Sequence, residues 1–141
     1  MILLDTNAVS ELMRGQPSEI VLDWFDAQDA KALFLSAVSE AELRTGVALL
    51  PPGWRRDRLL TSVDAMIEHD FLGRLLPFDS AAARAYADIF AERRTAGRPI
   101  MEADCQIAAI AAARGMVVAT RNVADFSGCG IAVIDPWQPA A

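Results

Sequence analysis

Short apolar runs alternate along the chain with longer segments in which apolar residues recur at helical spacing. The runs typical of strands buried on both faces are Met1–Leu4, Ala32–Val38, Leu75–Phe78, Met116–Thr120 and Ile131–Ile134. The spacing predicts helices over Ser18–Gln28, Arg56–Glu68, Ala81–Ala96 and Met101–Arg114, and one more that begins after Ser39 and ends at Pro51. Because strands alternate with helices, we expect an α/β fold, a three-layer sandwich in which helices flank a central, mostly parallel sheet.

Length and composition predict one folded domain, residues 1–141. A hydrophobic fraction of 53% excludes a disordered chain, since there is enough apolar surface to offset the conformational entropy lost on folding. No run approaches the roughly 18 apolar residues of a membrane span, so we expect a soluble, cytoplasmic protein. Cys105 and Cys129 lie in apolar or glycine-rich stretches and are predicted to be free thiols.

The charge balance is acidic, with a formal net charge of −6 and a pI of about 4.7. That balance argues against a broad basic face for nucleic acid, although acidic residues that hold divalent cations would reverse the local field. The arginines cluster as Arg55, Arg56 and Arg58 and again as Arg93, Arg94 and Arg98. Guanidinium groups suit phosphate, but we interpret each single arginine as part of a solvated helix face.

Several kinds of active site are excluded by composition. With His69 as the one histidine, neither a Ser-His-Asp triad nor a histidine zinc site is expected, and no phosphate-binding GxxxxGK[ST] loop is present. Carboxylates remain as the candidate chemistry. In parallel sheets ligands bind beyond the carboxyl ends of the strands, and Asp5 directly follows the first strand, with Thr6 and Asn7 able to orient it. Asp5 as a simple helix cap is the alternative.

Glu42 is the second candidate. Ser39 and Glu42 match the S-x-x-E capping box, and this pattern alone favours a capping role. Glu40 and Glu42 point about 200° apart on a helix, so one of them can face a given cleft. Glu42 is the candidate because it directly precedes Leu43 of the apolar stripe.

Asp104 shares a helix face with apolar residues, Ile107 and Ala108 among them, so its carboxylate is predicted to point toward the core. A buried carboxylate is costly unless it is paired or bound to a cation. Because no arginine or lysine lies one turn away on that face, Asp104 needs a metal or a base from another helix. Glu102 is predicted to face solvent instead.

A fourth ligand is expected after the strand that ends at Thr120, either Asn122 or Asp125. An asparagine carbonyl binds a hard cation without adding charge. If a helical turn begins near Asn122, both side chains share one face. Asp125 could instead cap that turn.

The segments that carry these residues resemble a known family. They are Met1-Ile-Leu-Leu-Asp5-Thr-Asn7, the stretch from Leu35 to Leu43, Ala103-Asp104-Cys-Gln-Ile-Ala-Ala109, the stretch from Ala119 to Phe126, and Asp135-Pro-Trp137. In this order and at these separations they are similar to the PIN domain, in particular to VapC and FitB-like toxins of bacterial toxin–antitoxin pairs.

By resemblance, Asp5, Glu42 and Asp104 match the metal-binding, catalytic acids, and Asn7 and Thr120 are supporting polar residues. The resemblance implies Mg²⁺- or Mn²⁺-dependent cleavage of RNA by the toxin of a type II toxin–antitoxin system. It also implies a homodimer silenced by an antitoxin that occludes the site. The fourth acid of the family often stands where this chain has Asn122, which leaves the second metal position to that residue or to Asp125.

Two other functions stay open on the sequence alone. One is a phosphatase with Asp5 as the nucleophile, disfavoured because Asn7 stands where an acid is wanted. The other is an inactive PIN-fold binding module, which Asn122 makes credible. For the ribonuclease, Arg44 lies one turn beyond Glu42 and is a candidate phosphate contact, with a solvated arginine as the alternative interpretation.

Overall fold

The central sheet has five strands, all parallel, in the order β3-β2-β1-β4-β5. The computed structural model describes residues 1–139. The strands are β1 (Ile2–Leu4), β2 (Leu33–Ser36), β3 (Leu75–Leu76), β4 (Val117–Ala119) and β5 (Val133–Ile134). Leu4 pairs with Leu35 of β2 and with Ala119 of β4, so these three strands end at nearly the same level. The expected parallel sheet is confirmed.

The helices are α1 (Thr6–Leu12), α2 (Glu19–Asp26), α3 (Ala37–Ala48), α4 (Trp54–Ala65), α5 (Ser80–Thr95), α6 (Glu102–Arg114) and the short α7 (Val123–Phe126). A 3₁₀ turn, η1 (Ala30–Ala32), precedes β2, and a π turn, η2 (Met66–Asp70), extends α4. Four of the predicted helices match α2, α4, α5 and α6. The fifth, α3, begins earlier than predicted, and α1 was predicted only as the helix that Asp5 would cap.

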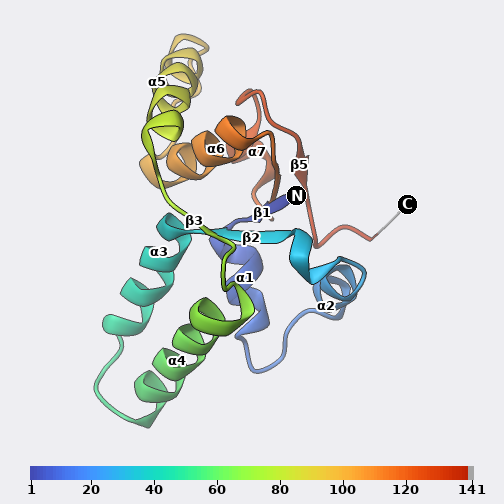
Figure 1. Cartoon of the computed structure of the whole chain (residues 1–141), viewed down its shortest axis with the longest axis vertical. Coiled ribbons are helices and arrows are strands. Elements are labelled where there is room, and N and C mark those ends of the chain that lie inside the picture. Colours follow the sequence, from blue (N-terminus) through green and yellow to red (C-terminus); the bar gives the residue numbers. More distant parts are fainter. Residues whose placement is uncertain (140–141) are drawn as a thin grey trace.

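Two apolar cores cover the two faces of the sheet, because successive side chains along a strand point to opposite faces. Leu3 of β1 belongs to the core beneath α5 and α6, together with Val118, Ile89, Ile107 and Ile110. Leu4 belongs to the core beneath α1, α3 and α4, together with Leu35, Val9, Leu43 and Val63. Figure 1 shows the two helical layers on opposite sides of the strands, which confirms the three-layer sandwich.

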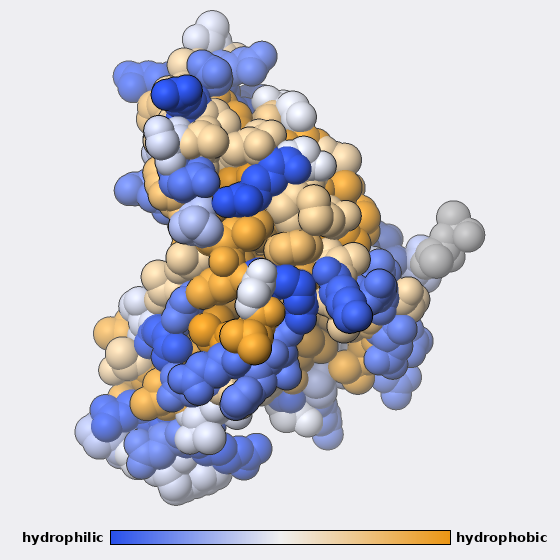
Figure 2. Space-filling view, viewed as in Figure 1, coloured by the Kyte–Doolittle hydropathy of each residue, from blue (hydrophilic) through white to orange (hydrophobic). Residues whose placement is uncertain are grey.

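The carboxyl ends of β1 and β2 lead into a hollow between the two helical layers. A pocket of about 500 Å³ lies there, lined by residues of α3, among them Glu42 and Thr45, and by Ala103 and Gln106 of α6. The left edge of the molecule is visibly indented between α5 above and α3 below (Figure 2). Of the candidate site residues, Glu42 lines this pocket.

Three smaller expectations can be compared with the fold. Cys105 and Cys129 are both free and buried, as predicted. His69 lies exposed in η2, at the end of α4. Within residues 1–139, no helix combines the length and the hydropathy that a membrane crossing requires.

Candidate active site

Asp5 joins the sheet to the site. It is buried, with 5% of its surface exposed, and its backbone N–H donates to the carbonyl of Ala119 at 2.9 Å. Its Oδ1 accepts from the N–H of Thr6 at 2.8 Å, and its Oδ2 accepts from the hydroxyl of Thr120 at 2.7 Å. Asp5 is thus the N-cap of α1, as the alternative interpretation had it, and is also oriented by the end of β4. Each carboxylate oxygen keeps a lone pair for a further ligand.

Thr120 is the centre of a polar network that holds Asp5. Its buried hydroxyl accepts from the side-chain amide of Asn7 at 3.3 Å and from the N–H of Asn122 at 3.0 Å. The side-chain oxygen of Asn7 accepts in turn from the N–H of Arg121 at 3.3 Å. The structure therefore brings the two predicted supporting residues, Asn7 and Thr120, together beside Asp5.

Glu42 reaches the same network from α3. The hydroxyl of Thr6 lies 2.7 Å from Glu42 Oε1 and 2.9 Å from Ser39 Oγ. Since a carboxylate can only accept, Thr6 donates its proton to Glu42, and Ser39 donates to Thr6. Sequence reasoning named Thr6 only as a residue that could orient Asp5, and it missed the buried Ser39 as part of the site.

The capping box predicted for Ser39 and Glu42 is wrong. β2 ends at Ser36, and Ser36 is the N-cap of α3, its hydroxyl accepting from the N–H of Ser39 at 3.1 Å. Because the helix begins earlier than predicted, Glu42 lies in its second turn and is not needed as a cap. Glu40 forms a salt bridge with Arg44, so the two glutamates do serve different faces.

Asp104 brings a third carboxylate from α6. Burial first, and then the like charges of Asp5, Asp125 and Glu42, raise its pKa to about 6 against an opposing effect of Arg93. The pKa of Asp5 is also raised, chiefly by burial, with hydrogen bonds from Thr120 and Thr6 opposing this and the charges of Glu42 and Asp125 adding to it. Four carboxylates from separate segments therefore share one electrostatic neighbourhood. Glu102 is exposed, as predicted.

Asn122 and Asp125 occupy the short turn after β4. α7 begins directly after Asn122, so the helical turn on which both candidates depended is present. Asp125 acts electrostatically on Asp5 and Asp104, and among residues 1–139 its carboxylate accepts no backbone hydrogen bond, which disfavours the capping interpretation. Asp125 is accordingly the stronger candidate for a fourth ligand, and both assignments stay predictions.

Arg44 and Arg93 were both interpreted from the sequence as solvated or phosphate-binding arginines. Arg44 bridges α3 to α4 through Glu40 at 2.7 Å and Asp64 at 2.8 Å, a pairing that gives no support to its predicted phosphate contact. Arg93 is buried, which contradicts its interpretation as part of a solvated face. It lies four residues after buried Ile89, a spacing that signalled the inner face of α5.

Arg93 of α5 places a positive charge near Asp104 but does not pair with its carboxylate. Its guanidinium donates to the carbonyls of Arg98, Asp125 and Ser127 at 2.7–2.8 Å. It also lowers the pKa of Asp104 electrostatically. It thus fixes the turn that carries Asp125 while leaving the carboxylate of Asp104 without a direct salt bridge.

The residues present fit a hard divalent cation. In the described part of the chain, none of the four carboxylates forms a salt bridge, so their charges are not neutralised by side chains. Among residues 1–139, no group of three or more acidic, histidine or cysteine side chains lies close enough together to hold a metal ion. An open, oxygen-only set of this kind suits Mg²⁺, which keeps several waters and is held by one or two carboxylates together with substrate phosphates.

Known proteins are similar to this chain over nearly its whole length. The model of the PIN domain family matches residues 2–127. "VapC ribonuclease Y4jK" of Sinorhizobium fredii is 46% identical over 140 residues, 99% of this chain and 100% of the relative. "Toxin FitB" of Neisseria gonorrhoeae is 44% identical over 138 residues, 98% of this chain and 99% of the relative.

Solved structures extend the likeness to three dimensions. "Structure of FitAB bound to IR36 DNA fragment" has a TM-score of 0.94 and 42% identity, covering 100% of this chain and 99% of that one. The DNA-bound VapBC of Salmonella typhimurium has a TM-score of 0.80 and 28% identity, covering 96% of this chain and 97% of that one. With the family model, the full-length relatives and the fold in agreement, the chain belongs to the PIN domain family.

Proposed function

We propose that the protein is a metal-dependent endoribonuclease, the toxin of a toxin–antitoxin pair. The observation that carries this proposal is the convergence of Asp5, Glu42, Asp104 and Asp125, without salt-bridge partners among the described residues, at the carboxyl ends of the strands. The names of the relatives support RNA as the substrate and toxin as the role. The buried free thiols are in keeping with the expected location in the cytoplasm.

The carboxylates would hold Mg²⁺ or Mn²⁺, which supplies an activated water and a polarised phosphoryl oxygen for phosphodiester hydrolysis. The chain's own contribution is orientation. Thr6 and Thr120 each occupy one oxygen of Asp5, and the Thr6 hydroxyl also fixes Glu42. Asp5 and Glu42 are therefore positioned by hydrogen bonds of the folded chain itself.

We further propose that an antitoxin segment covers the cleft and that the toxin is a homodimer. The solved relatives named above are FitAB and VapBC complexes. In this chain Leu49, which is 80% exposed, lines the pocket beside Glu42 and offers apolar surface to a partner. A monodisperse monomer at high concentration that copurifies with nothing from its native host contradicts this assignment.

The phosphatase alternative loses support in the structure. A nucleophilic Asp5 needs a neighbouring acid and a cation for phosphate, but the side chain of Asn7 is committed to Thr120 and the backbone of Arg121. The inactive binding module is the remaining alternative, which a cleavage assay separates from the nuclease.

The test is cleavage of a labelled structured RNA by the pure protein with Mg²⁺, with Mn²⁺ and with excess EDTA. We expect cleavage only with metal.

Asp5→Asn is expected to lose about 10²–10⁴-fold in rate, since a catalytic metal supplies several kcal/mol and each 1.36 kcal/mol is tenfold. Asp125→Ala is expected to lose less, and Asn122→Asp to leave activity equal or higher. Asp88→Asn, exposed on α5, is the control. Cleavage in excess EDTA, or full activity of Asp5→Asn, contradicts the proposal.

A further inference from the structure

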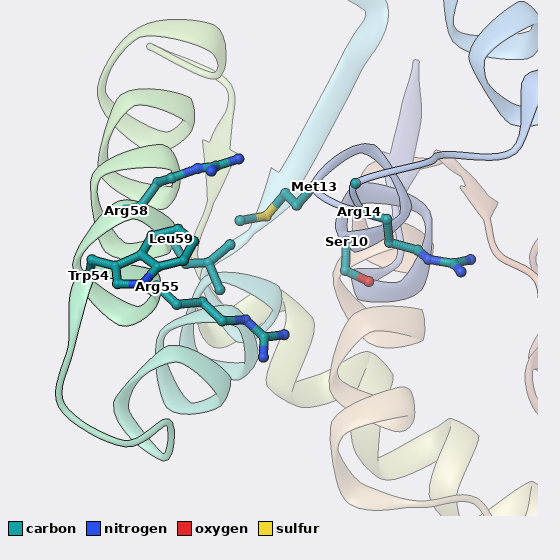
Figure 3. A pocket seen from close by; sticks show the side chains of 8 residues that line it. Ser10, Met13, Arg14, Trp54, Arg55, Arg58 and Leu59 are labelled. Atoms are coloured by element: carbon teal, nitrogen blue, oxygen red, sulfur yellow. The ribbon is translucent and has the colours of Figure 1, made fainter.

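A second pocket, of about 490 Å³, lies between α1 and α4, outside the carboxylate cluster. Ser10 and Arg14 line it from α1 and the segment that follows, and Trp54, Arg55 and Arg58 line it from α4. Figure 3 shows Arg55 extending from α4 toward the gap, whereas the guanidinium of Arg14 points away from α4. Nothing in the carboxylate chemistry described above uses this pocket.

The pocket carries positive charge in an acidic protein. Three arginines line it and no acidic residue does, although the chain has a net charge of −6. Arg14 is balanced by Glu11, 3.1 Å away. In the part of the chain that the structure describes, the guanidinium groups of Arg55 and Arg58 form neither a salt bridge nor a hydrogen bond, so their forks are available to an anionic ligand.

Trp54 adds an aromatic surface to these charges. It begins α4, 73% of its surface is exposed, and the guanidinium carbon of Arg58 lies 6.0 Å from its ring centroid. Trp54 and Arg55 also line a neighbouring hollow of about 310 Å³ beside Pro51 and Pro52. A cationic groove with an exposed aromatic ring is the pattern that holds unpaired nucleic acid, with phosphates on the arginines and a base on the ring.

α1 connects this pocket to the carboxylates. Thr6, which donates to Glu42, lies one helical turn before Ser10, and residues four apart share a helix face. The rise of about 1.5 Å per residue places Ser10, which lines the pocket, roughly 6 Å along the axis from Thr6. An RNA chain whose scissile phosphate lies at the carboxylates therefore has its next few nucleotides within reach of the pocket.

We propose that this pocket binds single-stranded RNA next to the cleavage site, with Arg55 and Arg58 pairing with phosphates and Trp54 stacking on an unpaired base. The proposal rests on the proposed ribonuclease function and extends it to the unpaired character of the substrate. An acidic protein segment would also satisfy the arginines, and the experiments below separate it from RNA.

The first experiment measures binding of a fluorescent, unpaired oligoribonucleotide in EDTA by anisotropy over a range of salt concentrations. The double variant Arg55→Gln/Arg58→Gln is compared with Arg84→Gln/Arg94→Gln, a matched pair exposed on α5. We expect the first pair to weaken binding at least tenfold and to reduce the log–log salt slope by about 1.4, because each phosphate contact on single strands contributes about 0.7. The control pair leaves both quantities unchanged.

The second experiment separates stacking from charge. Trp54→Ala is expected to weaken binding of the unpaired RNA about tenfold with an unchanged salt slope, in the range measured for base–aromatic stacking. Trp54→Phe keeps most of the affinity. Once the same RNA is annealed to its complement, Trp54→Ala binds like the unaltered protein, because no base is free to stack. Equal losses on single strand and duplex contradict the stacking role.

An RNA affinity of the Arg55/Arg58 variant that equals the control pair's overturns the inference. So does a variant that loses only a poly-glutamate peptide and keeps RNA, because the pocket is then a protein-docking site. These measurements need neither metal nor cleavage. An unaltered protein that never cleaves RNA refutes the proposed function, whereas one that cleaves while its variants bind RNA normally refutes the pocket alone.

Discussion

The carboxylate site and the arginine pocket are built in opposite ways. In the site, Asp5 and Thr120 are buried and their polar atoms are engaged with one another or with backbone N–H groups. In the pocket, Arg55, Arg58 and Trp54 are exposed, and the two guanidinium groups have no carboxylate partner within residues 1–139. The same helix, α1, begins in one region and ends in the other.

The two regions differ in how much they destabilise the metal-free fold. Gathering carboxylates at the strand ends disfavours the metal-free fold, because burial and like charge raise the pKa values of Asp5 and Asp104. Solvated arginines on α4 cost the fold little. Substitutions in and around the site are therefore expected to change stability and metal binding, and those in the pocket to change ligand binding alone.

Arg93→Met against Arg58→Met is the comparison with the largest expected effect. Arg93→Met leaves three carbonyls without their charged donor and is expected to lower the free energy of unfolding by about 3 kcal/mol. Arg58→Met is expected to stay within about 0.5 kcal/mol, as surface substitutions usually do. Urea unfolding of both variants measures the difference. If the two variants have similar free energies of unfolding, the buried Arg93 contributes no more to stability than the exposed Arg58.

Thr120→Val against Ser10→Ala compares a hydroxyl of the site with one of the pocket. Thr120→Val removes the donor to Asp5 Oδ2, and Ser10→Ala removes a hydroxyl that donates to the carbonyl of Asn7. We expect Thr120→Val to weaken Mn²⁺ binding and RNA cleavage about 10–100-fold, the usual cost of losing a group that orients a metal ligand. Thr120→Ser restores both.

Calorimetric Mn²⁺ titration of the Thr120 and Ser10 variants tests positioning apart from activity. The Ser10 variant is expected to bind Mn²⁺ like the unaltered protein. If Thr120→Val binds Mn²⁺ normally, Asp5 does not depend on this hydroxyl for its orientation.

Asp104→Asn has the smallest expected effect. It tests how much the ionised carboxylate of Asp104 destabilises the metal-free fold. The folded-state pKa of about 6 lies above the ordinary value of 3.8, so the folded chain binds this proton more tightly than the unfolded chain. The metal-free protein therefore loses stability as pH rises from about 4 to about 6. Allowing for solvent screening of a partly buried side chain, we expect Asp104→Asn to melt about 3–4 °C higher at pH 7.5 and not at pH 4.

Thermal melting in EDTA and then in Mg²⁺ measures both sides of the Asp104 prediction. Metal that binds only the folded state stabilises the unaltered protein by about 2.7 kcal/mol at a hundredfold excess over Kd. Asp104→Asn is expected to lose that response, while Asp88→Asn on α5 keeps it. A lower melting temperature for Asp104→Asn with an intact Mg²⁺ response would place Asp104 outside the cluster.

Much of the fold and of the site could be predicted from local patterns. The alternation of apolar runs and helical stripes indicated a parallel α/β sheet, and the end of an apolar run located Asp5. Periodicity placed Asp104 on the inner face of its helix. The capping pattern at Ser39 and Glu42 was misleading, because such a motif spans four residues whereas the true cap of α3, Ser36, is set by where β2 ends. Glu42 stayed a candidate for the site.

The sequence by itself determined which residues follow strands and which lie on apolar helix faces, since both properties depend on neighbours along the chain. Tertiary structure alone decided the strand order, the burial of Arg93 and the meeting of Thr6, Glu42 and Ser39. It also decided that Trp54 and Arg55 face α1 across a pocket. Burial and electrostatic fields act through space and sum over segments far apart in sequence, and no periodicity within a single element records that sum.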